Sequence, residues 1–142
     1  MAYTAKLLIR DVVCVGPDAT VTEAARVMTS KNIGAAVVGT MARPEGILSE
    51  RDVCRRVVTE GKDPAKTLVK DVMTKKPVTV DAAEPLDKVF ERLSDGRFRH
   101  IPITDKGEVV GIVSLTDLAR VLQEVYRDDK YLQYFADVIQ GR

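Results

Sequence analysis

The chain has 142 residues, 45% of them hydrophobic, which is enough for one ordinary domain or for two small halves that share a core. Its 22 Lys and Arg residues nearly balance its 21 Asp and Glu residues, and a net charge of +1 provides no field that would gather nucleic acid or an anionic membrane. No apolar run approaches the roughly 20 residues of a membrane span and residues 1–6 lack a signal-peptide core, so we expect a cytoplasmic protein.

Taken in chain order, hydrophobic patterns and turn residues in the first half predict a strand, a helix, two strands and a helix. These five segments are residues 12–15, 20–32, 33–38, 46–49 and 53–58. An apolar entry segment at residues 7–9 precedes them. Thr20 and Glu23 fit a capping box at the start of the first helix.

The second half repeats this order. Residues 46–52 return as residues 111–117, a shift of 117 − 52 = 65 positions, and the ten-residue windows that end at Arg55 and Arg120 are identical at five positions. Chance would give about one identity or fewer, so we infer an internal repeat. The corresponding elements are residues 78–80, 86–93, 98–103, 111–114 and a helix that continues to about Tyr126.

This repeat predicts an α+β fold in which two pseudo-symmetric β-α-β-β-α units pack sheet to sheet with their helices outside. We place the first unit at residues 1–62, the second at 63–126 and a helical tail at 127–142. Apolar residues of the tail fall at helical spacing: Tyr131, Leu132, Tyr134, Phe135, Val138 and Ile139. Such a helix could pack on its own module or be buried at a subunit interface, and the pattern leaves both alternatives open.

Two β-α-β-β-α units that each end in Gly-h-h-Ser-x-x-Asp, where h is an apolar residue, resemble a tandem CBS-domain pair, or Bateman module. The resemblance extends from about Leu7 to Gln123. It implies a compact module with two clefts, one or both of which hold an adenosine-containing ligand such as AMP, ADP, ATP, S-adenosylmethionine or NAD. It also implies that the aspartates of the two motifs, Asp52 and Asp117, accept hydrogen bonds from the ribose hydroxyls.

The chemistry of the motif supports this role but also allows another. An ionised carboxylate accepts hydrogen bonds through two oxygens and therefore suits a vicinal diol. Ser49 with Asp52, and Ser114 with Asp117, also have the form of a helix capping box. We expect the serines to act as caps, a role that is compatible with ligand binding by the acids.

For the phosphates of a nucleotide, the sequence offers Arg97, Arg99 and His100 at the entry of a buried strand. Arg99 and His100, followed by Ile101 and Pro102, resemble the basic pair that meets phosphates in nucleotide-binding CBS modules. Arg51 also precedes Asp52 at a helix N-terminus, where an anion is favoured. The alternative is that these are solvated surface charges.

The first repeat has Gly34, Ala35, Ala36 and Val37 at the positions that match Arg99 to Pro102, so we expect the two clefts to differ. The resemblance further implies apolar walls for the base, although core packing would explain each of these residues equally well. Beside Ser114 and Asp117 they are Leu8, Val13 and Ile33; beside Ser49 and Asp52 they are Met73, Val78 and Phe98; Ile101 and Pro102 complete the set.

No set of residues predicts a catalyst, because there is no Ser-His-Asp arrangement and no phosphate-binding Gly-x-x-x-x-Gly-Lys loop. We therefore expect a non-enzymatic adenine-nucleotide sensor without a required cofactor or metal, which forms a homodimer and switches an unknown partner protein. The alternatives are a structural or dimerisation module with empty clefts and, third, a phosphoryl-transfer enzyme. Cys14 and Cys54 are predicted to be buried thiols.

Overall fold

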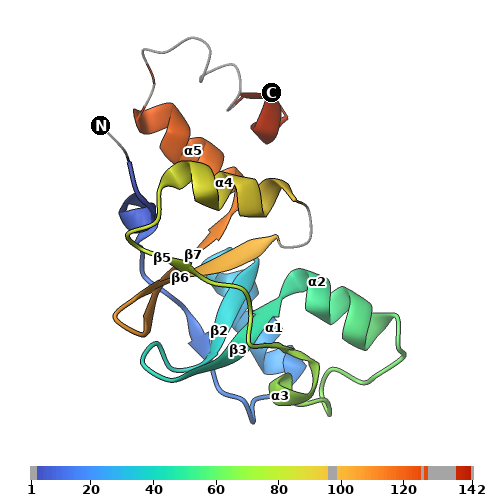
Figure 1. Cartoon of the computed structure of the whole chain (residues 1–142). Helices are drawn as coiled ribbons and strands as arrows, with labels where there is room; N and C mark the ends of the chain where they lie inside the picture. The colour runs from blue at the N-terminus through green and yellow to red at the C-terminus, as the bar shows by residue number, and fades with distance from the viewer. Residues whose placement is uncertain (1–2, 96–98, 126, 128–136, 142) are drawn as a thin grey trace.

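The computed structural model describes residues 3–95, 99–125, 127 and 137–141 (Figure 1). The predicted order of strand, helix, two strands and helix occurs twice in it. The elements of the first repeat and its lead-in are η1 Ala5–Leu8, β1 Cys14–Val15, α1 Val21–Lys31, β2 Ala35–Gly39, β3 Pro44–Ser49, α2 Glu50–Val53 and the π-helical turn η2 Cys54–Val58. Those that follow are α3 Val69–Val72, β4 Thr74–Lys75, β5 Val80–Asp81, α4 Leu86–Ser94, β6 His100–Asp105, β7 Glu108–Ser114 and α5 Leu115–Val125.

The strands form two sheets with the same pairing scheme. The first sheet has the order β1-β2-β3-β4 and the second the order β5-β6-β7, each starting with a parallel pair followed by an antiparallel pair. Val37 pairs with Ile47 and Pro102 pairs with Ile112, so the register is the same at the shift of 65. Strands lie between α1 and α2 at one end and α4 and α5 at the other (Figure 1). The predicted α+β fold of two repeats is confirmed.

Each repeat has its own hydrophobic core, but the segment leading into one repeat closes the core of the other. Ala5 and Leu8, ahead of the first repeat, are fully buried in the core of the second. Val69 and Val72, ahead of the second repeat, are buried in the core of the first, and β4 extends the first sheet beside β3. The two repeats are therefore interlocked, because neither core is complete without a segment that precedes the other repeat.

Glycine is required where these lead-in segments run against β3 and β7. A Cβ atom on Gly46 would lie 2.5 Å from the carbonyl oxygen of Thr74, and one on Gly111 would lie 2.6 Å from that of Leu8. Both distances are too short for real atoms, so the repeated glycine of the motif makes room for a passing backbone.

The predicted burial of Cys14 and Cys54 is wrong, because both thiols are exposed. In β1, Val15 takes the buried side of the strand and Cys14 therefore points outward. In η2 the buried residue is Val57, which leaves Cys54 on the outer side. Burial still raises the pKa of the Cys14 thiol, and a hydrogen bond with the backbone of Met41 opposes that shift.

The described part of the tail packs against α5. The Gln123 side chain donates to the Asp137 carboxylate at 3.0 Å and accepts from Gln140 at 3.1 Å. Tyr131, Leu132, Tyr134 and Phe135 lie outside the described residues, so the predicted aromatic face remains a prediction. None of the described helices combines the length and the apolar character that crossing a membrane would require.

Candidate functional site

Two clefts of similar size contain the two motif aspartates. The Asp52 cleft has a volume of about 350 Å³, and its lining includes Ser49, Asp52, Thr74, Val78, Arg99 and His100. The Asp117 cleft has a volume of about 370 Å³, and its lining includes Val13, Ile33, Gly34, His100, Ser114 and Asp117. Both volumes fall in the range of small-ligand sites.

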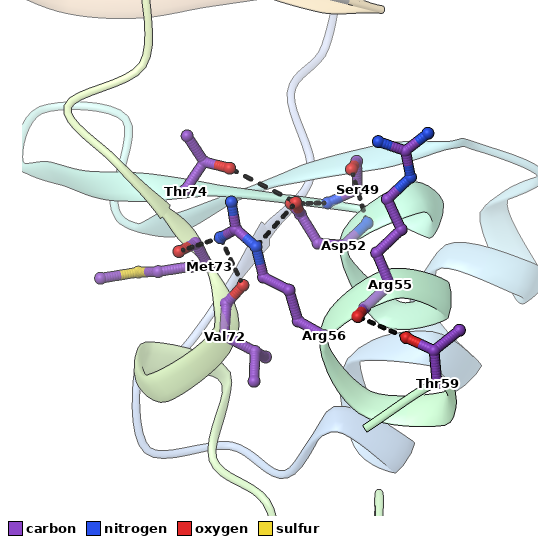
Figure 2. A network of polar contacts seen from close by, with 8 residues as sticks. All are labelled: Ser49, Asp52, Arg55, Arg56, Thr59, Val72, Met73 and Thr74. Atoms are coloured by element: carbon purple, nitrogen blue, oxygen red, sulfur yellow. Dashed lines mark hydrogen bonds and ion pairs between the residues drawn. The ribbon is translucent and has the colours of Figure 1, made fainter. Parts of the chain in front are cut away.

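Both carboxylate oxygens of Asp52 have contacts, and those of Oδ2 are shorter than those of Oδ1 (Figure 2). Its backbone N–H donates to Ser49 Oγ at 3.1 Å and its Oδ2 accepts from the Ser49 N–H at 3.0 Å, which completes the predicted capping box. Its Oδ1 has only longer contacts, 3.4 Å to Thr74 Oγ1 and 3.8 Å to Arg56 Nε. With 12% of the side chain exposed, Oδ1 remains a poorly satisfied acceptor at the cleft wall.

Asp117 has the same capping box with looser surroundings. Its N–H donates to Ser114 Oγ at 3.2 Å, and its Oδ2 accepts from the Ser114 N–H at 3.0 Å. Its Oδ1 lies 3.8 Å from Arg120 Nη1, and 29% of the side chain is exposed. The predicted capping role of both serines is confirmed, and each aspartate keeps one carboxylate oxygen with weak contacts.

The clefts differ most in charge. Five cationic side chains line the Asp52 cleft against one carboxylate, a balance of 5 − 1 = +4: Arg51, Arg55, Arg56, Lys76 and Arg99. Arg10 and Arg120 line the Asp117 cleft against Asp11 and Asp117, a balance of 2 − 2 = 0. Within the described part of the chain, Arg51, Arg55, Lys76 and Arg99 form no salt bridge, so four cations of the Asp52 cleft remain available to an anion.

His100 is shared by the two clefts. Its ring is close to Gly34, where a Cβ atom would lie 3.1 Å from Nε2, so the glycine makes room for the imidazole. Its Nδ1 is buried and has no hydrogen-bond partner among the described residues. Protonation or rotation of this one ring therefore changes the walls of both clefts.

Burial lowers the pKa of the His100 imidazole from its ordinary value of 6.5. The carboxylates of Asp117, Glu50 and Asp52 oppose this shift, and the guanidinium of Arg99 adds to it. The ring is consequently neutral at neutral pH and can both donate and accept one hydrogen bond.

The structure brings together some of the predicted site residues and separates others. Arg51, Val78 and Arg99 line the Asp52 cleft, and Val13 and Ile33 line the Asp117 cleft. Four predicted wall residues are buried and line neither cleft: Leu8, Met73, Ile101 and Pro102. Arg97 and Phe98 lie outside the described residues.

Several lining residues were missed by the sequence analysis. Arg55 and Arg120 occupy matching positions of the repeat, and that coincidence was the signal that could have revealed them. Thr74 and Lys76 carry no such signal, because they reach the Asp52 cleft only through the pairing of β4 with β3 at the edge of the first sheet. Lys76 also has φ +48°, in the left-handed region that non-glycine residues rarely adopt. No group of three side chains suited to a metal ion occurs among the residues described.

Comparison with known proteins identifies the family. The CBS domain model matches residues 5–59 and 69–124. The CBS domain-containing protein CBSX3, mitochondrial, of Arabidopsis thaliana is 37% identical over 130 residues, which cover 87% of this chain and 62% of that protein. The CBS domain-containing protein YhcV of Bacillus subtilis is 32% identical over 119 residues, 84% of each chain.

A solved structure agrees with these relatives. The CBS-domain containing protein ATU1752 from Agrobacterium tumefaciens is 35% identical and superposes with a TM-score of 0.74, covering 83% of this chain and 97% of that one. The chain spans 62% of the length of the CBSX3 protein and about a fifth of two longer Arabidopsis relatives.

Proposed function

The chain belongs to the CBS-domain family, and on that premise we propose that it is a regulatory module that binds adenine nucleotides and modulates a partner protein. The observation that carries the proposal is the Asp52 cleft, where an under-satisfied carboxylate oxygen lies beside four cations that form no salt bridge with any described residue. A ribose diol suits the first feature and phosphates suit the second.

The charge difference supports the proposal that phosphate-bearing ligands bind in the Asp52 cleft. Its balance of +4 favours ADP or ATP over adenosine, whereas the neutral Asp117 cleft gains little from added phosphates. Uncharged or zwitterionic adenosyl compounds fit the Asp117 cleft better. The two clefts would therefore report different metabolites.

As part of the same proposal, the module acts without catalysis and as a homodimer. Val58 is 65% exposed and lies on a hollow of about 460 Å³ that includes Val21, Ala25 and Val53. A second copy of the chain that covers this apolar surface would remove it from water. An effector then acts by binding two states of the dimer unequally.

A thermal-shift series with ATP, AMP and adenosine tests the proposal. A ligand that binds only the folded chain at 100 times its Kd should raise the unfolding free energy by about 2.7 kcal/mol, with ATP effective at the lowest concentration. If none of the three ligands shifts the transition at millimolar concentration, the chain is a structural module. Release of phosphate from ATP by the purified chain would favour an enzyme instead.

A further inference from the structure

The helix that follows Ser49 differs from its counterpart in the second repeat. α5 is a regular α-helix from Leu115 to Val125. The first-repeat helix changes after α2 into the π-helical turn η2, where the Thr59 N–H donates to the Cys54 carbonyl at 3.0 Å. A π turn places one extra residue in each hydrogen-bonded ring, so side chains beyond its start are rotated relative to an unbroken helix.

This rotation decides which side chain enters the core. At the shift of 65, Arg56 corresponds to Val121, which is 5% exposed in the second core. In the first repeat the fully buried residue is Val57, one position later. The π turn thus directs Val57 into the core and releases Arg56 toward the Asp52 cleft.

Arg56 there joins the two walls of the cleft (Figure 2). Its Nη1 donates to the carbonyl oxygens of Val72 at 3.0 Å and Met73 at 2.9 Å, at the end of α3. Its Nε lies 3.8 Å from Asp52 Oδ1, the oxygen that Thr74 also approaches. One planar guanidinium therefore links the helix that carries Asp52 to the backbone that leads into residues 74–78.

We propose that Arg56 is the positioning residue of the Asp52 cleft, and that it transmits ligand binding at Asp52 to the segment leading into the second repeat. The inference rests on the proposed function for its ligand and deepens it by naming a route of regulation. Among the described residues, the one salt bridge of Asp117 is with Arg120, three positions along the same helix. The Asp117 cleft consequently lacks this route.

Arg56→Lys tests the positioning role in the full chain. Lysine keeps the charge but is a compact point donor, and it cannot reproduce a planar fork across two carbonyls and a carboxylate. Arg92→Lys is the matched control, because Arg92 donates to the Thr79 carbonyl at 2.9 Å, pairs with Glu84 at 3.3 Å and lines neither cleft. Both changes are made in an Asp117→Ala background, which leaves Asp52 as the one motif aspartate.

Calorimetric titration with ATP and with adenosine separates the possible roles. A positioning residue should affect both ligands alike, so we expect Arg56→Lys to weaken both by the same factor, about fivefold or more, while Arg92→Lys leaves both unchanged. A loss confined to ATP would make Arg56 a phosphate ligand and overturn the inference. Equal losses in the two variants, or none in either, would also overturn it.

Hydrogen exchange tests the same residue without any ligand. We expect the amides of residues 73–76 to exchange about tenfold faster in Arg56→Lys than in Arg92→Lys, because the carbonyls at the end of α3 lose their anchor. Saturating ATP should slow these amides in the parent chain but not in Arg56→Lys. If these amides exchange in Arg56→Lys at the rate of the parent chain, the positioning role is refuted even if ATP binds. If ATP does not bind the parent chain, only the proposed function is refuted.

Discussion

At the scale of single residues, two identical motifs acquire different properties from what surrounds them. Asp52 and Asp117 share a capping box, yet Oδ1 of Asp52 contacts Thr74 of a distant segment as well as Arg56 of its own helical segment. Among the described residues, Oδ1 of Asp117 contacts Arg120 of its own helix. The cations also differ: the Asp52 cleft has four that form no salt bridge with a described residue, whereas the cations of the Asp117 cleft are balanced by carboxylates. Local sequence sets the cap, and tertiary neighbours set the charge of each cleft.

Arg99 is expected to contact phosphate but not the nucleoside. Arg99→Ala should weaken AMP binding by about fivefold, which is the effect of about 1 kcal/mol for an exposed ion pair, and should leave adenosine binding unchanged. The loss should shrink as salt is added. Calorimetry checks this with Arg43→Ala, a turn residue that lines neither cleft, as the charge control. Equal losses for AMP and adenosine would refute the phosphate assignment.

A site residue can be predicted from the sequence when its role depends on neighbours that are close in the chain. The capping boxes at Ser49 and Ser114 were predictable because a cap depends on four consecutive residues. The access of Lys76 and Arg56 to the Asp52 cleft was not, since it depends on the pairing of β4 with β3 and on a π turn that shifts the helical phase. Hydrophobic periodicity cannot reveal a phase shift that tertiary packing imposes.

His100 should make stability depend on pH. Because burial lowers its pKa in the folded chain below 6.5, the unfolded chain binds the proton more readily. The unfolding free energy should therefore fall as the pH drops through about 6.5 toward the lower folded pKa, and His100→Gln should remove that part of the decrease. Urea unfolding at about pH 7.5 and about pH 5.5 measures it; the same pH dependence in His100→Gln would contradict this prediction.

At the scale of elements, the segments of the two repeats match their sequence patterns and the elements of the lead-in segments do not. α1 begins at the predicted Thr20 cap, and β2, β3, β6 and β7 lie close to their predicted positions. η1, α3 and β4 were missed because each has only two to four residues and completes the structure of the other repeat. No pattern within one repeat identifies a segment whose partners lie in the other.

The close approach of these short segments to Gly46 and Gly111 predicts the effect of adding a methyl group at each glycine. Gly46→Ala and Gly111→Ala should each lower the unfolding free energy by about 1–3 kcal/mol, because the new Cβ meets a backbone carbonyl that cannot turn away. Gly16→Ala is the control, since a Cβ there has no atom within 4 Å, and should change stability by less than about 0.5 kcal/mol. If denaturant unfolding gives the same free energy of unfolding for all three variants, the lead-in segments can shift freely.

At the scale of the whole molecule, two repeats with exchanged lead-in segments form one interlocked module. Its symmetry is broken in the Asp52 cleft by the five cationic side chains and by the contacts of Arg56 with the backbone. It is also broken by His100, which comes from the second repeat and lines both clefts. The two clefts thus differ in charge and share one wall residue. The repeat at the shift of 65 and a difference between the clefts were predicted from the sequence, whereas the contacts of Arg56 and the sharing of His100 required the structure.

The proposed homodimer predicts that Val58 contributes to association. Val58→Glu should place a charge on the apolar hollow and shift the chain from dimer to monomer at micromolar concentration. Met41→Glu, at a side chain that is 47% exposed outside that hollow, should leave the dimer intact. Sedimentation equilibrium distinguishes them, and a monomeric parent chain would exclude the dimer.

The central claim, that the Asp52 cleft binds an adenine nucleotide through Asp52, is tested most directly by calorimetric titration of ATP into the parent chain, Asp52→Ala and Asp117→Ala. A charge-assisted hydrogen bond contributes about 1.5–3 kcal/mol, so Asp52→Ala should weaken ATP binding by about ten- to a hundredfold. Asp117→Ala should leave that site intact. Unchanged ATP affinity in Asp52→Ala would contradict the account and reduce the Ser-x-x-Asp motif to a helix cap.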